Sequence, residues 1–275
     1  MEGRPRRSAL YMPGSNVRAL EKAKAIPADA LIFDLEDAVA PDAKVQARDQ
    51  VCGAVKAGGY GGREVVIRVN ALETPWGASD IIAACEAAPD AILVPKVIHS
   101  GDIISAAKLL QSVQAPDKVR LWAMMETPMA ILNARTIAAT AVYKDNRLDC
   151  LVMGTNDLIK ESRARALHDR FAVVPWLAMT LAAARAYKLD IIDGVSTSSA
   201  VISLSSPSSL ASLFSSSSLT KSKATSKRRL AICATAGLVS RSLNMAASAS
   251  SCAAARSFMG STYKATCVAK SFFKS

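Results

Sequence analysis

Acidic residues are missing from the last 80 positions of this 275-residue chain. Residues 196–275 carry ten Lys and Arg but no Asp or Glu, whereas residues 1–195 carry 24 Lys and Arg against 23 acids. The net charge of +11 therefore comes almost entirely from one end of the chain. Since the larger part is nearly neutral, we expect no nucleic-acid partner.

Long apolar runs and paired cysteines are also lacking. No apolar run approaches the length of a membrane span, so we expect no membrane partner. The six cysteines form no CxxC pair and show no Cys/His metal spacing. The basic first residues lack the apolar region of a secretory signal. We therefore expect a reduced protein in the cytoplasm.

The composition changes sharply near residue 195. Of residues 196–275, 24 are serine, which is typical of low-complexity sequence. We predict a barrel domain at 1–195 and a Ser-rich basic tail at 196–275. The tail is predicted to be disordered, or to result from a reading-frame change that replaced the natural ending. A basic arm that binds an acidic partner is the alternative.

Short apolar segments alternate with helical stretches along residues 1–195, as in βα units. We predict strands at 8–12, 30–33, 65–69, 91–94, 121–125, 151–153 and 190–192. We predict helices at 17–25, 43–57, 103–111, 129–139 and 175–187. Polar residues follow the strands directly, which favours an α/β fold of the TIM (β/α)8 type over an open doubly wound sheet. No eighth strand is recognisable, so we predict an incomplete barrel.

Two carboxylates stand at equivalent places after successive apolar runs. Glu126 follows the run that begins at Leu121, and Asp157 follows the run that begins at Cys150. Each could be a helix cap by itself. Together, at the mouth of a parallel barrel and without His or Cys nearby, they predict a site for Mg²⁺, with Mn²⁺ as the other possibility.

A second group of charges lies closer to the start of the chain. Asp34, Glu36 and Asp37 follow one predicted strand, and Arg68 interrupts the next. Such clustered acids need a cation, and a buried guanidinium needs a carboxylate from the protein or a substrate. We take Arg68, Glu36 and Asp37 as candidate catalytic residues. The alternatives are acids attracted to a helix N-terminus and a purely structural ion pair.

The loop that contains Pro13 and Gly14 joins a predicted strand to a predicted helix on which Arg18 and Lys22 lie one turn apart. These cations and the backbone donors could hold phosphate groups, although a plain loop with solvated charges explains them equally well. Lys96, after another strand, could form a Schiff base, which we treat as a minor alternative.

Several motifs together resemble the HpcH/HpaI aldolase and citrate lyase β-subunit family, which includes malyl-CoA lyases. The likeness runs from Arg7 to about Val195. The motifs are Tyr11-Met-Pro-Gly-Ser-Asn, Phe33-Asp-Leu-Glu-Asp-Ala-Val-Ala-Pro, Ile67-Arg-Val-Asn, Pro95-Lys-Val, Met125-Glu-Thr-Pro and Gly154-Thr-Asn-Asp-Leu. Their order along the chain makes coincidence a poor explanation.

The resemblance implies a Mg²⁺-dependent carbon–carbon lyase that cleaves a 3-hydroxyacyl-CoA thioester, of the malyl, citramalyl or citryl type, to acetyl-CoA and a 2-oxo acid. It implies Glu126 and Asp157 as metal ligands and Arg68 at the oxo-acid half. It also implies CoA contacts near the first loop, where Asn16 stands in place of a common arginine. The candidate substrate-binding residues are Tyr11, Asn16, Arg18, Lys22, Arg68 and Glu126.

The resemblance also implies a homo-oligomer, a trimer or hexamer, in which a C-terminal segment supplies a catalytic acid to a neighbour. The Ser-rich tail shows no such segment, so we expect the metal half-site to be kept and turnover to be weak. A malyl-CoA thioesterase and a non-catalytic subunit with a basic interaction tail are the alternatives.

Overall fold

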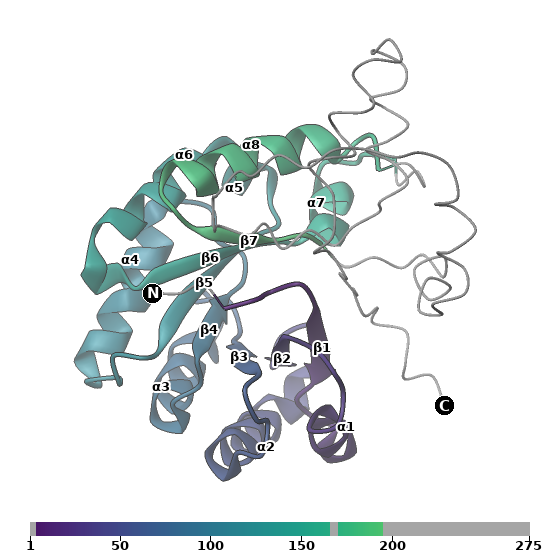
Figure 1. Ribbon diagram of the computed structural model, residues 1–275, viewed down its shortest axis with the longest axis vertical. Coiled ribbons are helices and arrows are strands. Elements are labelled where there is room, and N and C mark those ends of the chain that lie inside the picture. The colour runs from purple at the N-terminus through teal and green to yellow at the C-terminus, as the bar shows by residue number, and fades with distance from the viewer. Residues whose placement is uncertain (1–3, 166–169, 195–275) are drawn as a thin grey trace, which may run out of the picture.

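The fold is a curled half-barrel of seven parallel strands. The computed structural model describes residues 4–165 and 170–194. The strands are hydrogen-bonded in chain order into one sheet, and Figure 1 shows how it curls, with helices on its outer side. Their bounds are β1 (Ala9–Pro13), β2 (Ala30–Asp34), β3 (Glu64–Arg68), β4 (Ala91–Val94), β5 (Arg120–Met125), β6 (Leu148–Met153) and β7 (Asp190–Ile192). The α/β barrel type and all seven predicted strands are confirmed.

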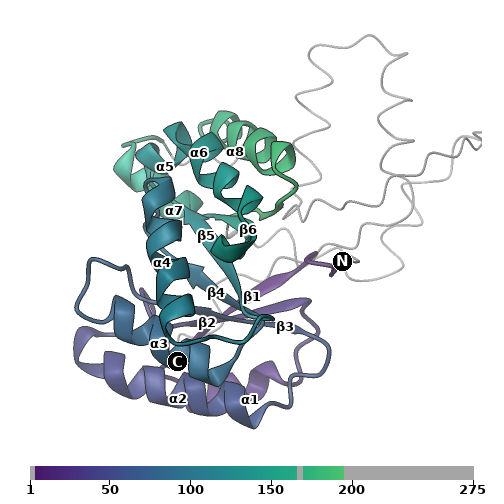
Figure 2. The same cartoon turned by 90° about the vertical axis from the view of Figure 1, so that its left-hand side faces the viewer.

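The helices form the outer layer, which is seen from the side in Figure 2. They are α1 (Val17–Ala23), α2 (Lys44–Ala57), α3 (Gly77–Ala87), α4 (Ser100–Ser112), α5 (Pro128–Leu132), α6 (Ala134–Ala139), α7 (Thr155–Glu161) and α8 (Val174–Ala186). Three short 3-10 turns join them, η1 (Pro41–Ala43), η2 (Thr140–Val142) and η3 (Lys144–Asn146). The sequence did not predict α3 and α7.

One predicted helix is wrong in detail, because residues 129–139 form two helices. Asn133 lies between α5 and α6 with φ −95° and ψ 7°, which turns the backbone out of the helical path. Its side-chain amide donates to the carbonyl of Ile98 at 2.7 Å. This contact ties the break to the loop after β4.

The side chains of each strand alternate between two apolar layers. One layer packs with the helices, and Phe33, Ile67 and Met125 belong to it. The other contains strand residues alone and fills the concave side of the sheet: Ala30, Ile32, Val66, Ala91, Leu93, Trp122, Met124, Cys150, Val152 and Ile192. Asp34, Arg68 and Glu126 each lie two residues beyond a member of this second layer, so their side chains point to the same side of the sheet. The period of the strands therefore places these three charged residues at the interior of the mouth.

Arg6 holds the opposite, N-terminal ends of the strands together. Its guanidinium lies 2.6 Å from Glu64 of β3, 2.5 Å from Asp149 of β6 and 2.8 Å from Asp190 of β7. It also stacks over the ring of Trp122 at 4.9 Å. A residue before the first strand thus connects strands from both halves of the sheet.

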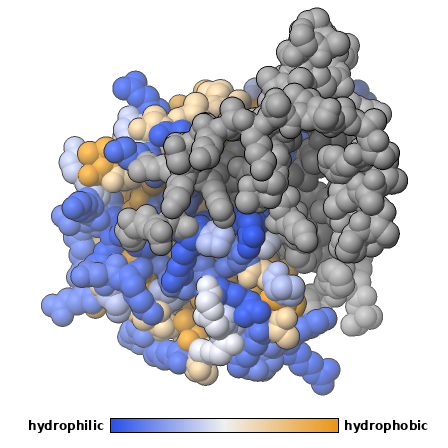
Figure 3. Space-filling model, viewed as in Figure 1, coloured by the Kyte–Doolittle hydropathy of each residue, from blue (hydrophilic) through white to orange (hydrophobic). Residues whose placement is uncertain are grey.

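The outer surface of the described part is mostly hydrophilic on the face of Figure 3, with small apolar patches. Within residues 4–165 and 170–194, no helix is long and apolar enough to cross a membrane. Three cysteines, Cys52, Cys85 and Cys150, are buried free thiols. The predictions about residues 196–275, including the tail and the missing strand, lie outside the described residues.

Candidate functional site at the mouth of the half-barrel

Arg68 and Asp34 form a buried pair at the carboxyl ends of adjacent strands. The parallel register of β2 and β3 sets the two residues side by side. Nε and Nη2 of Arg68 donate to the two carboxylate oxygens of Asp34 at 2.7 and 2.6 Å. This two-point contact uses one edge of the guanidinium and fixes its orientation. The structural pairing that the sequence left open is therefore present.

The remaining guanidinium nitrogen of Arg68 faces the rest of the acidic cluster. Nη1 lies 2.6 Å from Glu36 Oε2 and 3.5 Å from Asp37. The guanidinium also lies 5.5 Å from the ring centre of Tyr11. Burial lowers the pKa of Arg68, but Asp34 and Glu36 outweigh that effect and raise it. Arg68 thus stays charged and joins all three acids to Tyr11.

Glu36 keeps unused bonding capacity. Its Oε2 is buried and has no hydrogen-bond partner, because the contact with Arg68 is an ion pair without hydrogen-bond geometry. Burial raises the pKa of Glu36, and Arg68 opposes that shift. A buried carboxylate oxygen with a free lone pair is a suitable partner for a cation or a substrate proton.

Lys44, which follows the acidic motif in the family resemblance, anchors the acidic loop. Its ammonium donates to the carbonyls of Leu35 and Glu36 at 2.9 and 2.7 Å. Burial lowers its pKa. Because these carbonyls belong to the acidic loop itself, Lys44 anchors the backbone that carries Glu36 and Asp37.

Glu126 and Asp157, the predicted metal ligands, converge on one cation. Lys96 Nζ makes an ion pair with Asp157 and lies 3.6 Å from Glu126 Oε1. The backbone N–H of Lys96 also donates to Glu126 Oε1 at 2.8 Å. Glu126 follows β5, and Asp157 lies in the first turn of α7. The structure therefore brings the two acids to one place, as the repeat of the motif predicts.

Glu126 is almost completely buried, with 1% of its side chain exposed. Desolvation raises its pKa to about 7, although the backbone N–H and the ammonium of Lys96 oppose this shift. Gly154 packs directly beside it, since a Cβ there would lie 2.3 Å from that of Glu126. A residue larger than glycine would therefore displace this carboxylate.

The two clusters form one electrostatic site. The charges of Glu36 and Arg68 both act on the pKa of Glu126, and that of Glu36 acts on Lys96. Three cations, Arg68, Lys96 and Lys44, face five carboxylates: Asp34, Glu36, Asp37, Glu126 and Asp157. This excess of negative charge fits an added cation.

The donor set also fits a hard divalent ion. Only carboxylates converge here, which suits Mg²⁺ or Mn²⁺ better than zinc. No group of three His, Cys, Asp or Glu residues suited to a metal occurs within the described ranges. A Mg²⁺ ion held by two carboxylates keeps other positions for water and substrate oxygens. A pair of carboxylates such as Glu126 and Asp157 is thus compatible with such an ion.

The loop after β1 and the helix α1 that follows it carry three other predicted substrate-binding residues, Asn16, Arg18 and Lys22. Asn16 caps α1 by accepting a hydrogen bond from the backbone of Ala19 at 3.1 Å, so its side chain has a structural role. Arg18 and Lys22 lie on the exposed side of α1. Gly14 allows a close approach, since a Cβ there would lie 2.7 Å from the carbonyl of Asp34. The loop therefore packs directly against the acidic cluster.

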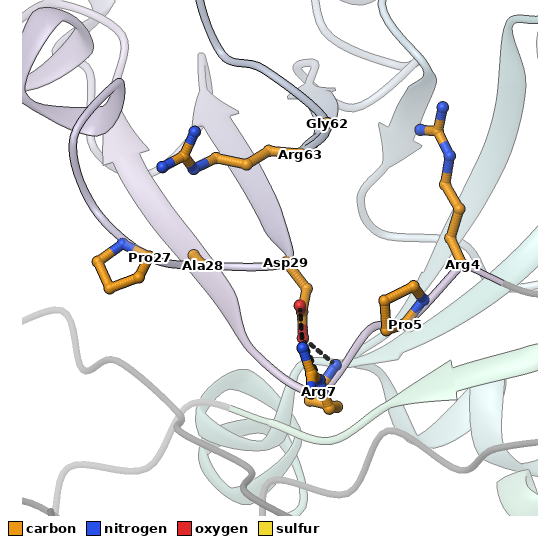
Figure 4. Close-up of a pocket in the computed structure, with 8 residues that line it drawn as sticks. All are labelled: Arg4, Pro5, Arg7, Pro27, Ala28, Asp29, Gly62 and Arg63. Atoms are coloured by element: carbon orange, nitrogen blue, oxygen red, sulfur yellow. Dashed lines mark hydrogen bonds and ion pairs between the residues drawn. The ribbon is translucent and has the colours of Figure 1, made fainter.

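A separate pocket lies at the other end of the strands. It is lined by Arg4, Pro5, Arg7, Pro27, Ala28, Asp29, Gly62 and Arg63 (Figure 4). Arg7 faces Asp29 across it with contacts of 2.9 and 3.0 Å. These residues precede β1, β2 and β3, whereas the candidate site follows the strands. The pocket shares no residue with the candidate site.

Further polar residues after the strands serve the scaffold. Asn70 donates to Asp80 from both its backbone and its side chain, and Asp193 pairs with Arg170 through two contacts of 2.6 Å. The ion pairs of Lys96 raise its pKa despite its partial burial. Its amine thus stays protonated, which disfavours the Schiff-base alternative.

A parallel half-barrel with carboxylates and a fixed arginine at the carboxyl ends of its strands is typical of α/β-barrel enzymes, whose active sites lie at that face. The chain belongs to the HpcH/HpaI aldolase/citrate lyase family, whose model matches residues 7–203. This confirms the family that the motifs predict. The family consists of enzymes that act on CoA esters.

Named relatives differ in the reaction they carry. The chain is 48% identical over 194 residues to a (3S)-malyl-CoA thioesterase of Cereibacter sphaeroides, covering 70% of this chain and 64% of the relative. It is 31% identical over 197 residues to the citrate lyase subunit beta of Escherichia coli, with coverages of 70% and 64%. The chain thus spans about 64% of the length of these relatives.

A solved structure supports the same fold. CitE of Mycobacterium tuberculosis, in complex with magnesium, acetoacetate and coenzyme A, matches with a TM-score of 0.57 and 25% identity. The match covers 70% of this chain and 67% of that one. That protein therefore combines this fold with a divalent metal, an oxo acid and a CoA group.

Proposed function

We propose that this chain is a Mg²⁺-dependent enzyme that acts on the CoA thioester of a short hydroxy dicarboxylic acid. The observation that carries the proposal is the convergence of Glu126 and Asp157 on a single cation beside Arg68. Glu126 and Asp157 would hold the metal. When bound, Mg²⁺ would polarise the carbonyl of a 2-oxo acid as a Lewis acid.

Arg68 would stabilise the negative charge that develops on the substrate. Asp34 holds its Nε and Nη2 edge, so Nη1 is the nitrogen that faces the acidic loop. A donor that is fixed before the reaction stabilises an enolate oxygen without having to reorganise. Tyr11, beside the same guanidinium, would contact the thioester.

Carbon–carbon cleavage is the first candidate reaction. The substrate hydroxyl loses its proton, the bond between its carbon and the carbon next to the thioester breaks, and the latter becomes an enolate that takes up a proton. The products are a 2-oxo acid and acetyl-CoA. Glu36 is the candidate acceptor of the hydroxyl proton, because it is buried and one of its oxygens lacks a hydrogen-bond partner.

Hydrolysis of the thioester is the second candidate, and the 48% identity to malyl-CoA thioesterases favours it. Water attacks the thioester carbonyl, the carbon–sulfur bond breaks, and free CoA leaves with the hydroxy acid. The same metal and the same arginine would serve this reaction. We also propose that the protein forms homo-oligomers, as the family resemblance implies.

The test is to incubate the full chain with malyl-CoA and Mg²⁺ and to measure glyoxylate, acetyl-CoA and free CoA. Glyoxylate with acetyl-CoA indicates the lyase, whereas free CoA with malate indicates the thioesterase. Glu126→Gln should lower the rate by more than about 100-fold, because a metal ligand matters more than its outer-shell partners.

Glu161→Gln is the matched control, because Glu161 is exposed on α7 one turn beyond Asp157. It should leave the rate unchanged. Turnover that persists in excess EDTA, or in Glu126→Gln, would contradict the proposal.

A further inference from the structure

Lys96 occupies the point at which the two proposed metal ligands meet. Its Nζ makes an ion pair with Asp157 and lies 3.6 Å from Glu126. One ammonium of the same protein therefore lies beside both carboxylates and offsets part of their negative charge. A divalent ion bound by the same two acids would need the position that this ammonium takes.

The backbone of Lys96 fixes one end of this arrangement. Lys96 adopts a left-handed conformation with φ 52°, which is uncommon for a residue with a Cβ. In it, the backbone N–H donates to Glu126 Oε1 at 2.8 Å. The backbone contact holds the carboxylate of Glu126 independently of the ammonium, so the ammonium can leave while Glu126 stays in place.

The side chain of Lys96 is also able to move. It is 31% exposed, whereas that of Glu126 is 1% exposed. A lysine stem has four carbons and many rotamers, unlike the planar guanidinium that Asp34 holds by two contacts at Arg68. The partly exposed Lys96 therefore pairs with the two carboxylates proposed for the metal. The fixed Arg68 pairs with acids that hold no metal in our proposal.

We propose that Lys96 is an internal counter-ion that holds the metal site in its metal-free form and is displaced when a divalent cation binds. The inference rests on the proposed function, because it takes Glu126 and Asp157 as the metal ligands. The ammonium prevents repulsion between the two acids before the metal arrives. The ammonium also competes with the metal. The apparent Kd for the metal equals the intrinsic Kd divided by the fraction of molecules in which the lysine is displaced.

The test compares the full-length wild type with Lys96→Met, which keeps a similar unbranched stem and removes the charge. Titration calorimetry with MgCl₂ and no substrate should show a Kd lower by about tenfold or more in Lys96→Met, as expected when a competing state populated about 90% of the time is removed. Thermal unfolding gives a second readout. Without Mg²⁺ the Tm of Lys96→Met should be lower than that of the wild type. Saturating Mg²⁺ should raise the Tm of Lys96→Met by more than it raises the Tm of the wild type.

Lys160→Met is the matched control, because Lys160 is exposed on α7, one turn beyond Asp157. Lys160→Met removes the same charge as Lys96→Met, but from α7, where the side chain contacts neither acid. The Mg²⁺ affinity of Lys160→Met should therefore equal that of the wild type. An equal rise in affinity in both variants would show a general effect of charge and overturn the proposal. A wild-type affinity, or a weaker one, in Lys96→Met would also overturn it.

The same titration separates this inference from the proposed function. If neither the wild type nor Lys96→Met binds Mg²⁺, the metal site itself is wrong. If both bind it equally, the metal site stands and only the role of Lys96 fails.

Discussion

The two ends of the half-barrel use the same kinds of charged residue for opposite purposes. At the N-terminal end, the cation Arg6 is the buried centre, with 8% of its side chain exposed, and Asp149 and Asp190 extend toward water. At the mouth, the acid Glu126 is the buried member, and its cation Lys96 is the exposed one. In the pairs of Arg6 with Asp149 and Asp190 the cation is the more buried partner, whereas in the pair of Lys96 with Glu126 it is the acid.

We propose that this difference makes the mouth, and not the N-terminal end, the place for a metal. Arg6 cannot lose its proton, and it is held by Glu64, Asp149, Asp190 and the ring of Trp122 at once. Glu126 is desolvated and poorly compensated, which is the condition that an added cation relieves. We therefore expect the N-terminal end to contribute mainly to stability and the mouth to bind the cation.

The largest expected effect comes from Arg6→Met. This change leaves Glu64 buried without its counter-ion, so the free energy of unfolding should fall by about 3–5 kcal/mol, as for other broken buried pairs. Urea unfolding measures it. Mg²⁺ binding at the mouth should be unaffected in the folded variant. A loss below about 1 kcal/mol would contradict the comparison.

At the mouth, removing the charge of Glu126 should have the opposite effect on stability. Its pKa is about 7 in the folded, metal-free protein and about 4.3 when unfolded. The folded state therefore binds the proton more tightly, and stability falls as pH rises from about 4 to above 7. The difference between these two pKa values corresponds to about 4 kcal/mol of stability between these limits.

Glu126→Gln should lack this component of the pH dependence. Its urea midpoint at pH 8 should therefore exceed that of the metal-free wild type, while the two should be similar at pH 5. If the two proteins show parallel pH profiles, Glu126 does not carry the charge that we assign to it.

Asp157→Asn should have a smaller effect, confined to metal binding. Asp157 is partly exposed, so its loss costs little in stability. We expect the Kd for Mg²⁺ to rise by more than about 100-fold, because Asp157 is a proposed metal ligand and a ligand matters more than its outer-shell partners; titration calorimetry measures it. Glu161→Asn, on the same exposed helix, should bind Mg²⁺ like the wild type. Unchanged binding in Asp157→Asn would remove this residue from the ligand set.

The smallest effect is expected for Arg7→Ala, next to Arg6 in the chain. Arg7 pairs with Asp29 at 2.9 Å, but its side chain is 43% exposed. Exposed pairs contribute less than about 1 kcal/mol. Urea unfolding should show this small loss beside the large one of Arg6→Met. Equal losses would mean that burial does not separate the two arginines.

Much of the scaffold could be predicted from sequence, because it depends on local pattern. Apolar runs with polar residues directly behind them predict β2, β3 and β5 together with Asp34, Arg68 and Glu126. The short helix α7 has too few apolar positions to show a helical period, so it was not predicted. The break at Asn133 depends on a contact with Ile98, which is distant in sequence.

Side-chain partnerships show the same division. The repeat of the motif predicts that Glu126 and Asp157 lie together, and the isolated charge of Arg68 in a strand predicts a carboxylate partner. No local pattern connects Lys96 to Asp157, which is 61 positions away, or Arg6 to Asp190, which is 184 positions away.

The sequence by itself determined the α/β class, the family and the residue types at the mouth, because strand period and motif spacing are properties of neighbouring residues. Which charged groups are buried at each end, and which cation pairs with each acid, depends on the tertiary structure. Desolvation depends on everything that packs around a group, and the curl of the sheet brings together carboxylates and cations that lie far apart along the chain.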